Sequence, residues 1–219
     1  MKEYFRQIGL KRIIYTILGV VILGIGITGL RLSGFGTDPY SCMNIGLSSH
    51  LPISYGTLQM LENILLFIPI IIFYPRSFGL GALFNMLCLG YIVDFCMWLC
   101  SLAGVTVEAV AGYMAMRILL LLVGLLVFCF GVALYMHCDL GIATYDMIGQ
   151  IIDDRTHGRY PFKWARVTTD LLCMVIGFVS GGTVGIATVV VAFFTGPVVS
   201  WFREHIASRL LEVPEVPEH

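Results

Sequence analysis

The chain has 219 residues, of which 58% are hydrophobic and only 12% are charged, and its mean hydropathy is +0.89. A soluble domain carries about 25% charged residues, so this composition excludes a soluble globular protein and predicts an all-α integral membrane protein. The net charge of −1 says nothing about partners, and no segment is basic and aromatic enough to predict nucleic-acid binding.

Six apolar segments are long enough to cross a bilayer, which takes about 20 residues of helix. We expect transmembrane helices at 12–31, 56–75, 79–102, 112–136, 164–181 and 184–203. The first segment lacks a small-x-small cleavage site and further spans follow it. It is therefore predicted to be a retained helix rather than a signal peptide.

The basic residues fall almost entirely on one side of this predicted arrangement. Of the 13 lysines and arginines, only Arg31 and Arg117 lie on the outer side when the N-terminus is placed inside. Because cytoplasmic loops carry the excess of lysine and arginine, the pattern favours six spans with both termini in the cytoplasm.

An internal repeat appears when each residue is aligned with the residue 105 positions later. The aligned pairs are Gly19 and Gly124, Gly26 and Gly131, Gly36 and Gly141, and Tyr40 and Tyr145. We therefore predict two three-helix repeats, at 1–104 and 105–210, followed by a disordered acidic tail at 211–219. Three spans is an odd number, so the second copy is expected to be inverted in the membrane, as in many transporters.

The segment after the first span of each repeat is too apolar for a simple connection and predicts a short, broken helix. At 36–50, Asp38 is the expected N-cap and Pro39 the first helical residue. At 141–155, Thr144 is the candidate cap, with Asp146 in the first turn.

Two interpretations of these short helices stay open. They are either re-entrant half-helices whose N-terminal N–H groups point at a central site, or amphipathic helices that lie in the membrane interface. The first interpretation makes a set of residues candidates for substrate binding. They are Asp38, Pro39, Tyr40, Asn85, Thr144, Tyr145 and Asp146.

Ionisable residues inside spans are costly and are therefore functional candidates, for buried charge or for ion coupling. Glu62, Asp94 and Arg117 are all expected in the outer half of the membrane, where they could meet. Alternatively, Glu62 and Arg117 reach the outer surface and only Asp94 is buried. Asp170 is a further candidate, and it is spaced to pair with Arg166 on one helix face.

The segments GFGTDPYSCMNIGLS and GLGALFNMLCLGYIVDF carry a resemblance to a known family. They resemble the YczE-like branch of the YczE/YyaS/YitT-type bacterial membrane proteins, over residues 13–203. The positions that carry it are Gly36, Asp38, Pro39, Gly79, Gly81, Asn85 and Asp94. The second repeat departs from the pattern, with Ala143-Thr144 where the first has Asp38-Pro39. The resemblance implies a bacterial plasma membrane but neither an activity nor a substrate.

The sequence favours a secondary transporter or channel-like carrier for a small polar or anionic solute. The alternative is a non-transporting accessory or regulatory membrane protein that acts through a protein partner. No HExxH or GxSxG motif is present, so we expect no enzyme, and we expect no cofactor or metal. The expected partners are bilayer lipid, a small solute and, if the repeats close across two chains, a second copy in a homodimer.

Overall fold

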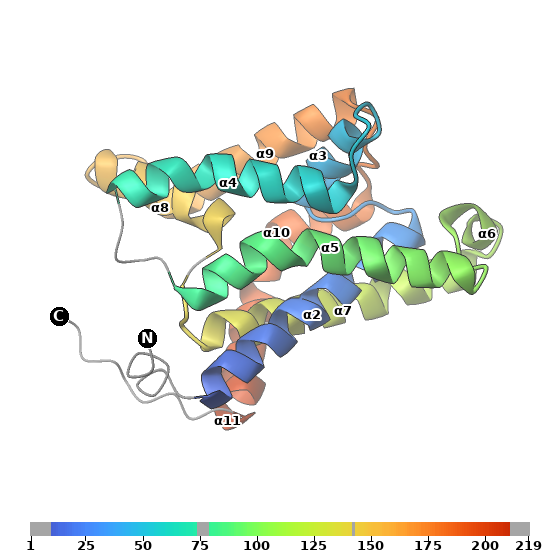
Figure 1. The fold of residues 1–219 in the computed structure, drawn as a ribbon, viewed down its shortest axis with the longest axis horizontal. Helices are drawn as coiled ribbons and strands as arrows, with labels where there is room; N and C mark the ends of the chain where they lie inside the picture. The colour runs from blue at the N-terminus through green and yellow to red at the C-terminus, as the bar shows by residue number, and fades with distance from the viewer. Residues whose placement is uncertain (1–9, 74–78, 142, 211–219) are drawn as a thin grey trace.

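The computed structural model describes residues 10–73, 79–141 and 143–210 (Figure 1). Within these ranges the regular structure is entirely helical, as predicted. The tail at 211–219 and Arg76 lie outside the described residues, as does the side chain of Asp146.

Four helices are long and apolar enough to cross a membrane, and they match the first four predicted spans. They are α2 (Leu10–Ser33), α4 (Tyr55–Phe73), α5 (Leu80–Leu102) and α7 (Met114–His137). The 24 residues of α2 reach about 36 Å, which exceeds the roughly 30 Å of a hydrocarbon core. A short helix, α6 (Val107–Ala111), precedes α7 at the right of Figure 1.

The last two predicted spans are less regular than the first four. Helix α9 (Phe162–Val179) carries Lys163, Arg166 and Asp170, which is more charge than an ordinary span has. Helix α10 (Ile186–Phe202) contains Pro197, and the chain bends by 59° between its first part and the part from Pro197 to Leu210. That second part includes η1 (Arg203–Ala207) and α11 (Ser208–Leu210). By length and composition the described residues therefore give four spans, or five with the bent pair, against the six predicted.

Helices α2 and α7 pack antiparallel at the centre of the molecule (Figure 1). A Cβ on Gly26 would lie 2.5 Å from the backbone nitrogen of Phe128, and one on Gly131 would lie 2.5 Å from that of Leu23. Small residues allow backbones to approach this closely, as they do in helix pairs within bilayers. The glycines at these positions thus determine how near the two helices can come.

These contacts are reciprocal under the 105-residue offset. Gly19 meets Tyr135 and Gly124 meets Leu30, just as Gly26 meets Phe128 and Gly131 meets Leu23. Adding 105 to Gly26 gives Gly131, and subtracting 105 from Phe128 gives Leu23, so the first contact maps onto the second. The glycines that align in the sequence therefore occupy equivalent places in the helix packing.

The segments that follow α2 and α7 each cap a helix in the opposite half of the chain. The carbonyl of Phe35 accepts a hydrogen bond from the Ala187 amide at the start of α10, at 3.0 Å. The carbonyl of Leu140 accepts one from the Gly81 amide at the start of α5, at 2.8 Å. The first N–H groups of a helix have no partner within it, so each half supplies an acceptor for the other.

The two short helices also pack against the opposite half. Helix α3 (Pro39–Ser48) lies on α9, where a Cβ on Gly46 would be 2.9 Å from the Gly177 carbonyl oxygen. Helix α8 (Thr144–Arg155) lies on both α4 and α9. The two short helices are found toward opposite ends of the long axis in Figure 1.

The packing of α2 on α7 leads to the first prediction. In Gly26→Ala, the added methyl group meets the Phe128 backbone, which cannot rotate away, so the helices must separate. We expect a loss of about 1–3 kcal/mol in stability, the usual cost of overpacking. It can be measured by thermal melting of the purified protein in detergent.

Gly112→Ala is the matched control, because a Cβ there meets nothing within 4 Å. It should melt like the native chain. Equal melting of both variants would show that α2 and α7 do not approach as closely as described.

Candidate functional site

The rings of Tyr40 of α3 and Tyr145 of α8 stack against each other. Their centroids are 4.9 Å apart and their planes differ by 28°. Each tyrosine is the second residue of its short helix, so the N-terminal ends of α3 and α8 meet at this stack. Tyr40 is only 8% exposed, which places this end of α3 inside the protein.

The start of α3 follows the sequence prediction. Asp38 is the N-cap and accepts a hydrogen bond from the Ser41 amide at 2.9 Å through Oδ2, with Pro39 as the first helical residue. The predicted cap is thus confirmed. The other oxygen, Oδ1, is buried and has no hydrogen-bond partner among the residues that the structure describes. A buried carboxylate oxygen without a donor is costly, so this atom is a vacant acceptor at the helix junction.

Glu62 of α4 joins the site through α3. The amide of Asn44, oriented with its nitrogen toward the carboxylate, donates to both Glu62 oxygens, with Oε1 at 3.1 Å. The Tyr40 hydroxyl donates to Oδ1 of Asn63 at 3.4 Å. Asn44 lies one helical turn after Tyr40, so both side chains leave the same face of α3 toward α4.

Asp170 of α9 lies beside Tyr145. The Tyr145 hydroxyl donates to Asp170 Oδ1 at 2.7 Å, and Arg166 Nε lies 3.6 Å from Oδ2. The predicted spacing of Arg166 and Asp170 thus produces a real ion pair. The Arg166 guanidinium also lies over the Tyr145 ring, 5.2 Å from its centroid. Asp170 is 7% exposed, so its charge depends on these partners.

We call this set the central polar cluster. Its members are Asp38, Tyr40, Ser41, Asn44, Tyr55, Glu62, Asn63, Tyr145, Arg166 and Asp170. It contains three carboxyl groups and one guanidinium, so hydrogen-bond acceptors outnumber cationic donors in it.

Other predicted residues lie elsewhere. Asp94 Oδ2 accepts from the Gly56 amide at 2.8 Å and so holds the start of α4. Arg117 donates to the carbonyls of Ser33 and Gly34, at 2.8 and 3.2 Å, at the end of α2. The predicted meeting of Glu62, Asp94 and Arg117 is therefore not found, because the latter two satisfy backbone groups at helix ends.

The remaining candidates for substrate binding are Thr144, Asn85 and Asp146. Thr144 is buried as the first residue of α8, but the cap position belongs to Ala143 and no side chain caps this helix, so the predicted Thr144 cap is not formed. Asn85 is buried on α5, and among the described residues it makes no hydrogen bond to the cluster. Asp146 lies in the first turn of α8, and its side chain is outside the description.

Sequence reasoning missed Ser41, Asn44 and Tyr55. The Ser41 and Tyr55 hydroxyl groups lie 2.9 Å apart, and Asn44 is fully buried. The helical spacing of Tyr40 and Asn44 is a signal that could have found Asn44. Within the described residues, no group of three or more histidine, cysteine, aspartate or glutamate side chains has a metal-binding arrangement.

Comparison with known proteins gives the family. Residues 10–204 match the model of DUF6198, a family of unknown function. The chain belongs to this family. No solved structure matches it.

The curated relatives agree with the resemblance seen in the sequence. An uncharacterised protein of Haemophilus influenzae is 29% identical over 208 residues, covering 93% of this chain and 88% of the relative. The uncharacterised membrane protein YczE of Bacillus subtilis is 24% identical, covering 81% and 79%. The uncharacterised protein YyaS of Bacillus subtilis is 23% identical, covering 89% and 93%. The family resemblance is confirmed, and the protein is a membrane protein with all-helical architecture.

The position of Asp94 supports a prediction that separates a structural role from a role for its charge. Asp94→Asn retains an oxygen that accepts from the Gly56 amide, whereas Asp94→Ala leaves that amide unpaired. We expect the Asp94→Asn variant to melt near the native temperature. The Asp94→Ala variant should lose about 1–2 kcal/mol in free energy of unfolding, as proteins do when a helix cap is removed. Equal damage in both variants would instead assign the role to the negative charge.

Proposed function

We propose that this protein is a carrier for a small polar solute, built from two inverted three-helix repeats around the central polar cluster. In this proposal it moves a solute across the bacterial plasma membrane and catalyses no reaction. The observation that carries the proposal is the Tyr40–Tyr145 stack, in which two residues aligned by the repeat contact each other.

A two-fold axis explains this self-contact. The reciprocal glycine contacts relate α2 to α7, which run antiparallel, by a rotation about an axis perpendicular to both helices. If α2 and α7 cross the bilayer, that axis lies in the membrane plane. A residue that meets its own counterpart lies beside the axis, so Tyr40 and Tyr145 mark the midplane, where transporters with inverted repeats bind their substrates.

The same relation supports six spans, with α9 and α10 as the counterparts of α4 and α5. The charges that distinguish α9 from an ordinary span include Arg166 and Asp170, which pair with each other beside Tyr145. A helix that contributes charged groups to a protein-lined site is less apolar than an ordinary span, and it can still cross the membrane. Both termini are then cytoplasmic, as the distribution of basic residues favours.

The chemistry of the cluster narrows the solute. The cluster has three carboxyl groups, one of them with the unpartnered Asp38 oxygen, and three tyrosines, which present acceptors and aromatic faces. Against these stand the Arg166 guanidinium and that of Arg31, which lies 5.7 Å from the Tyr55 ring centroid. The N-terminal ends of α3 and α8 add partial positive charge, but this amounts to about half a charge each. The site therefore favours a hydrogen-bond donor that is uncharged or cationic, and it disfavours an anion.

In this proposal, alternating access requires the ring stack to open while the two halves turn about the segments whose carbonyls cap the opposite half. The stacked rings close the path between the two short helices, so a solute can pass only when the halves rotate and the rings separate. Gly36 and Gly141, with φ of +100° and +104°, lie beside the carbonyls that cap the opposite half. These backbone positions, which only glycine adopts without strain, are the natural pivots for such a rotation.

Ligand-dependent stability tests the solute class. Purified protein would be melted with methylammonium, guanidinium, choline or urea, and with phosphate or acetate as anionic probes. A ligand present at 100 times its Kd raises stability by about 2.7 kcal/mol. We expect a rise with at least one donor probe and none with the anions.

The control variants are Asp38→Asn, which keeps an N-cap side chain, and Asp94→Asn, which lies outside the cluster. The first should lose the ligand-dependent rise and the second should keep it. Stabilisation by an anion would contradict the solute class. Stabilisation by a co-purifying protein, with no response to any solute, would favour the accessory role instead.

Membrane topology tests the repeat independently of any solute. In a cysteine-free background, Arg159→Cys precedes α9 and Thr183→Cys follows it, and both positions are exposed. With α9 as a span, a membrane-impermeant maleimide applied to intact cells should label Thr183→Cys, and Arg159→Cys only after permeabilisation. Glu108→Cys, on α6, serves as the outer-side control. Labelling of both test positions from one side would show that α9 does not cross.

A further inference from the structure

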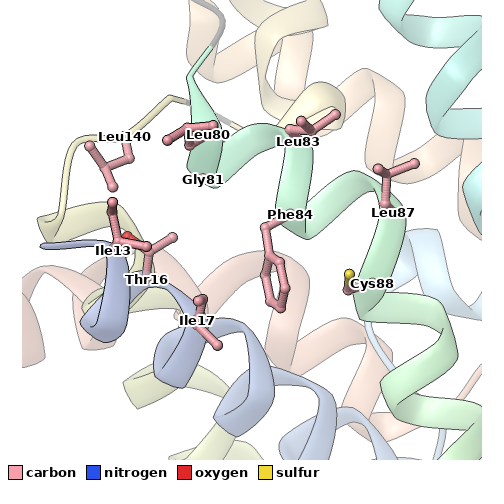
Figure 2. Close-up of a pocket in the computed structure, with 10 residues that line it drawn as sticks. All are labelled: Ile13, Thr16, Ile17, Leu80, Gly81, Leu83, Phe84, Leu87, Cys88 and Leu140. Atoms are coloured by element: carbon pink, nitrogen blue, oxygen red, sulfur yellow. The ribbon is translucent and has the colours of Figure 1, made fainter. Parts of the chain in front are cut away.

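An apolar groove lies between α2 and α5, apart from the central polar cluster. Its volume is about 260 Å³, and its walls include Ile13 and Ile17 of α2 and Leu80, Leu83, Phe84 and Leu87 of α5. Figure 2 shows these side chains around the space between the two helices, with Leu140 at one end.

The groove offers almost nothing to water. Thr16 brings a hydroxyl to the wall, and this hydroxyl already donates to the Arg12 carbonyl at 2.8 Å. A water molecule needs two to four polar partners to be held in a cavity, so the space is suited to hydrocarbon. In a membrane protein, the hydrocarbon at hand is a lipid acyl chain.

The length of the groove is close to the hydrocarbon thickness of one membrane leaflet. From Leu80 to Cys88 the groove follows nine residues of α5, or about 12 Å along the helix. Half of a hydrocarbon core is about 15 Å. The groove begins where α2 and α5 begin, at the same end of the molecule in Figure 1, so it runs inward from one membrane surface.

Positively charged side chains lie at the end of the groove where α2 begins. Lys11 is exposed, and Arg12 directly precedes Ile13 of the groove wall. Arg12 Nε donates to the Cys138 carbonyl at 3.1 Å, while its Nη2 is buried and has no hydrogen-bond partner among the described residues. A guanidinium with unused donors is well matched to a phosphate group.

We infer that the groove binds an anionic glycerophospholipid, with an acyl chain between α2 and α5 and its phosphate at Arg12. A second copy of the chain is a poorer occupant, because both copies share one orientation in the membrane and would bring their Lys11 and Arg12 to the same level.

Native mass spectrometry of the detergent-solubilised chain tests the inference, with phosphatidylglycerol and phosphatidylcholine of identical acyl chains as probes. We expect one phosphatidylglycerol to be retained about tenfold more tightly than phosphatidylcholine. Arg12→Gln should remove this preference while weak binding of both lipids remains. Leu83→Trp, which fills the groove, should lower binding of both.

Leu122→Trp is the matched control, since Leu122 is 54% exposed on α7 and lies outside the groove. It should bind like the native chain, and all variants should show native helix content by circular dichroism. Equal retention of the two lipids by the native chain, or unchanged binding in Leu83→Trp, would overturn the inference. A dimer that Leu83→Trp disrupts would assign the groove to a second copy.

Discussion

The close approach of α2 and α7 sets the position of the other elements. Gly19, Gly26, Gly124 and Gly131 bring the two backbones together, so side-chain bulk does not hold the halves apart. With lipid on the outside, burial of apolar surface cannot drive this pairing, and close packing of backbone on backbone must supply it. The other contacts between the halves are arranged around this pair.

The exchange of caps follows from that approach. The segments after α2 and α7 leave the central pair next to the start of a helix from the other half, where unpaired amides need acceptors. Phe35 and Leu140 provide them. Substituting a larger residue at Gly79 or Gly185 would press on these same carbonyls. Each half therefore has an incomplete helix end without the other, which argues that the two halves fold as one unit.

Much of this arrangement could be read from residue types with strong local preferences. Asp38 and Pro39 predicted the start of α3 because capping depends on three or four adjacent residues. The aligned glycines of α2 and α7 stand where the two backbones approach each other, and such an approach restricts the residue type itself. The first four spans could be predicted from apolar length alone. Helix α9 differs because it carries Arg166 and Asp170, which pair with each other, and Asp170 also accepts from Tyr145 of α8.

The partners of Glu62, Asp94 and Arg117 could not be predicted in the same way. Their depth in the membrane suggested a meeting, yet Asp94 and Arg117 bind backbone groups, which every residue has and which leave no pattern in a sequence. Likewise, the alignment paired Tyr40 with Tyr145 but did not say that they touch. Contact between two residues so far apart in the sequence depends on how the helices pack, and that is a property of the folded structure.

The two sides of the stack are equivalent in backbone but differ in chemistry. Tyr40 faces an uncharged amide and lies near Glu62, which is held by Asn44, whereas Tyr145 faces Asp170, which is paired with Arg166. The acid on the Tyr40 side is thus held by an amide and the acid on the Tyr145 side by a cation, so the two short helices share a tyrosine at the same helical position but differ in the polar contacts around it.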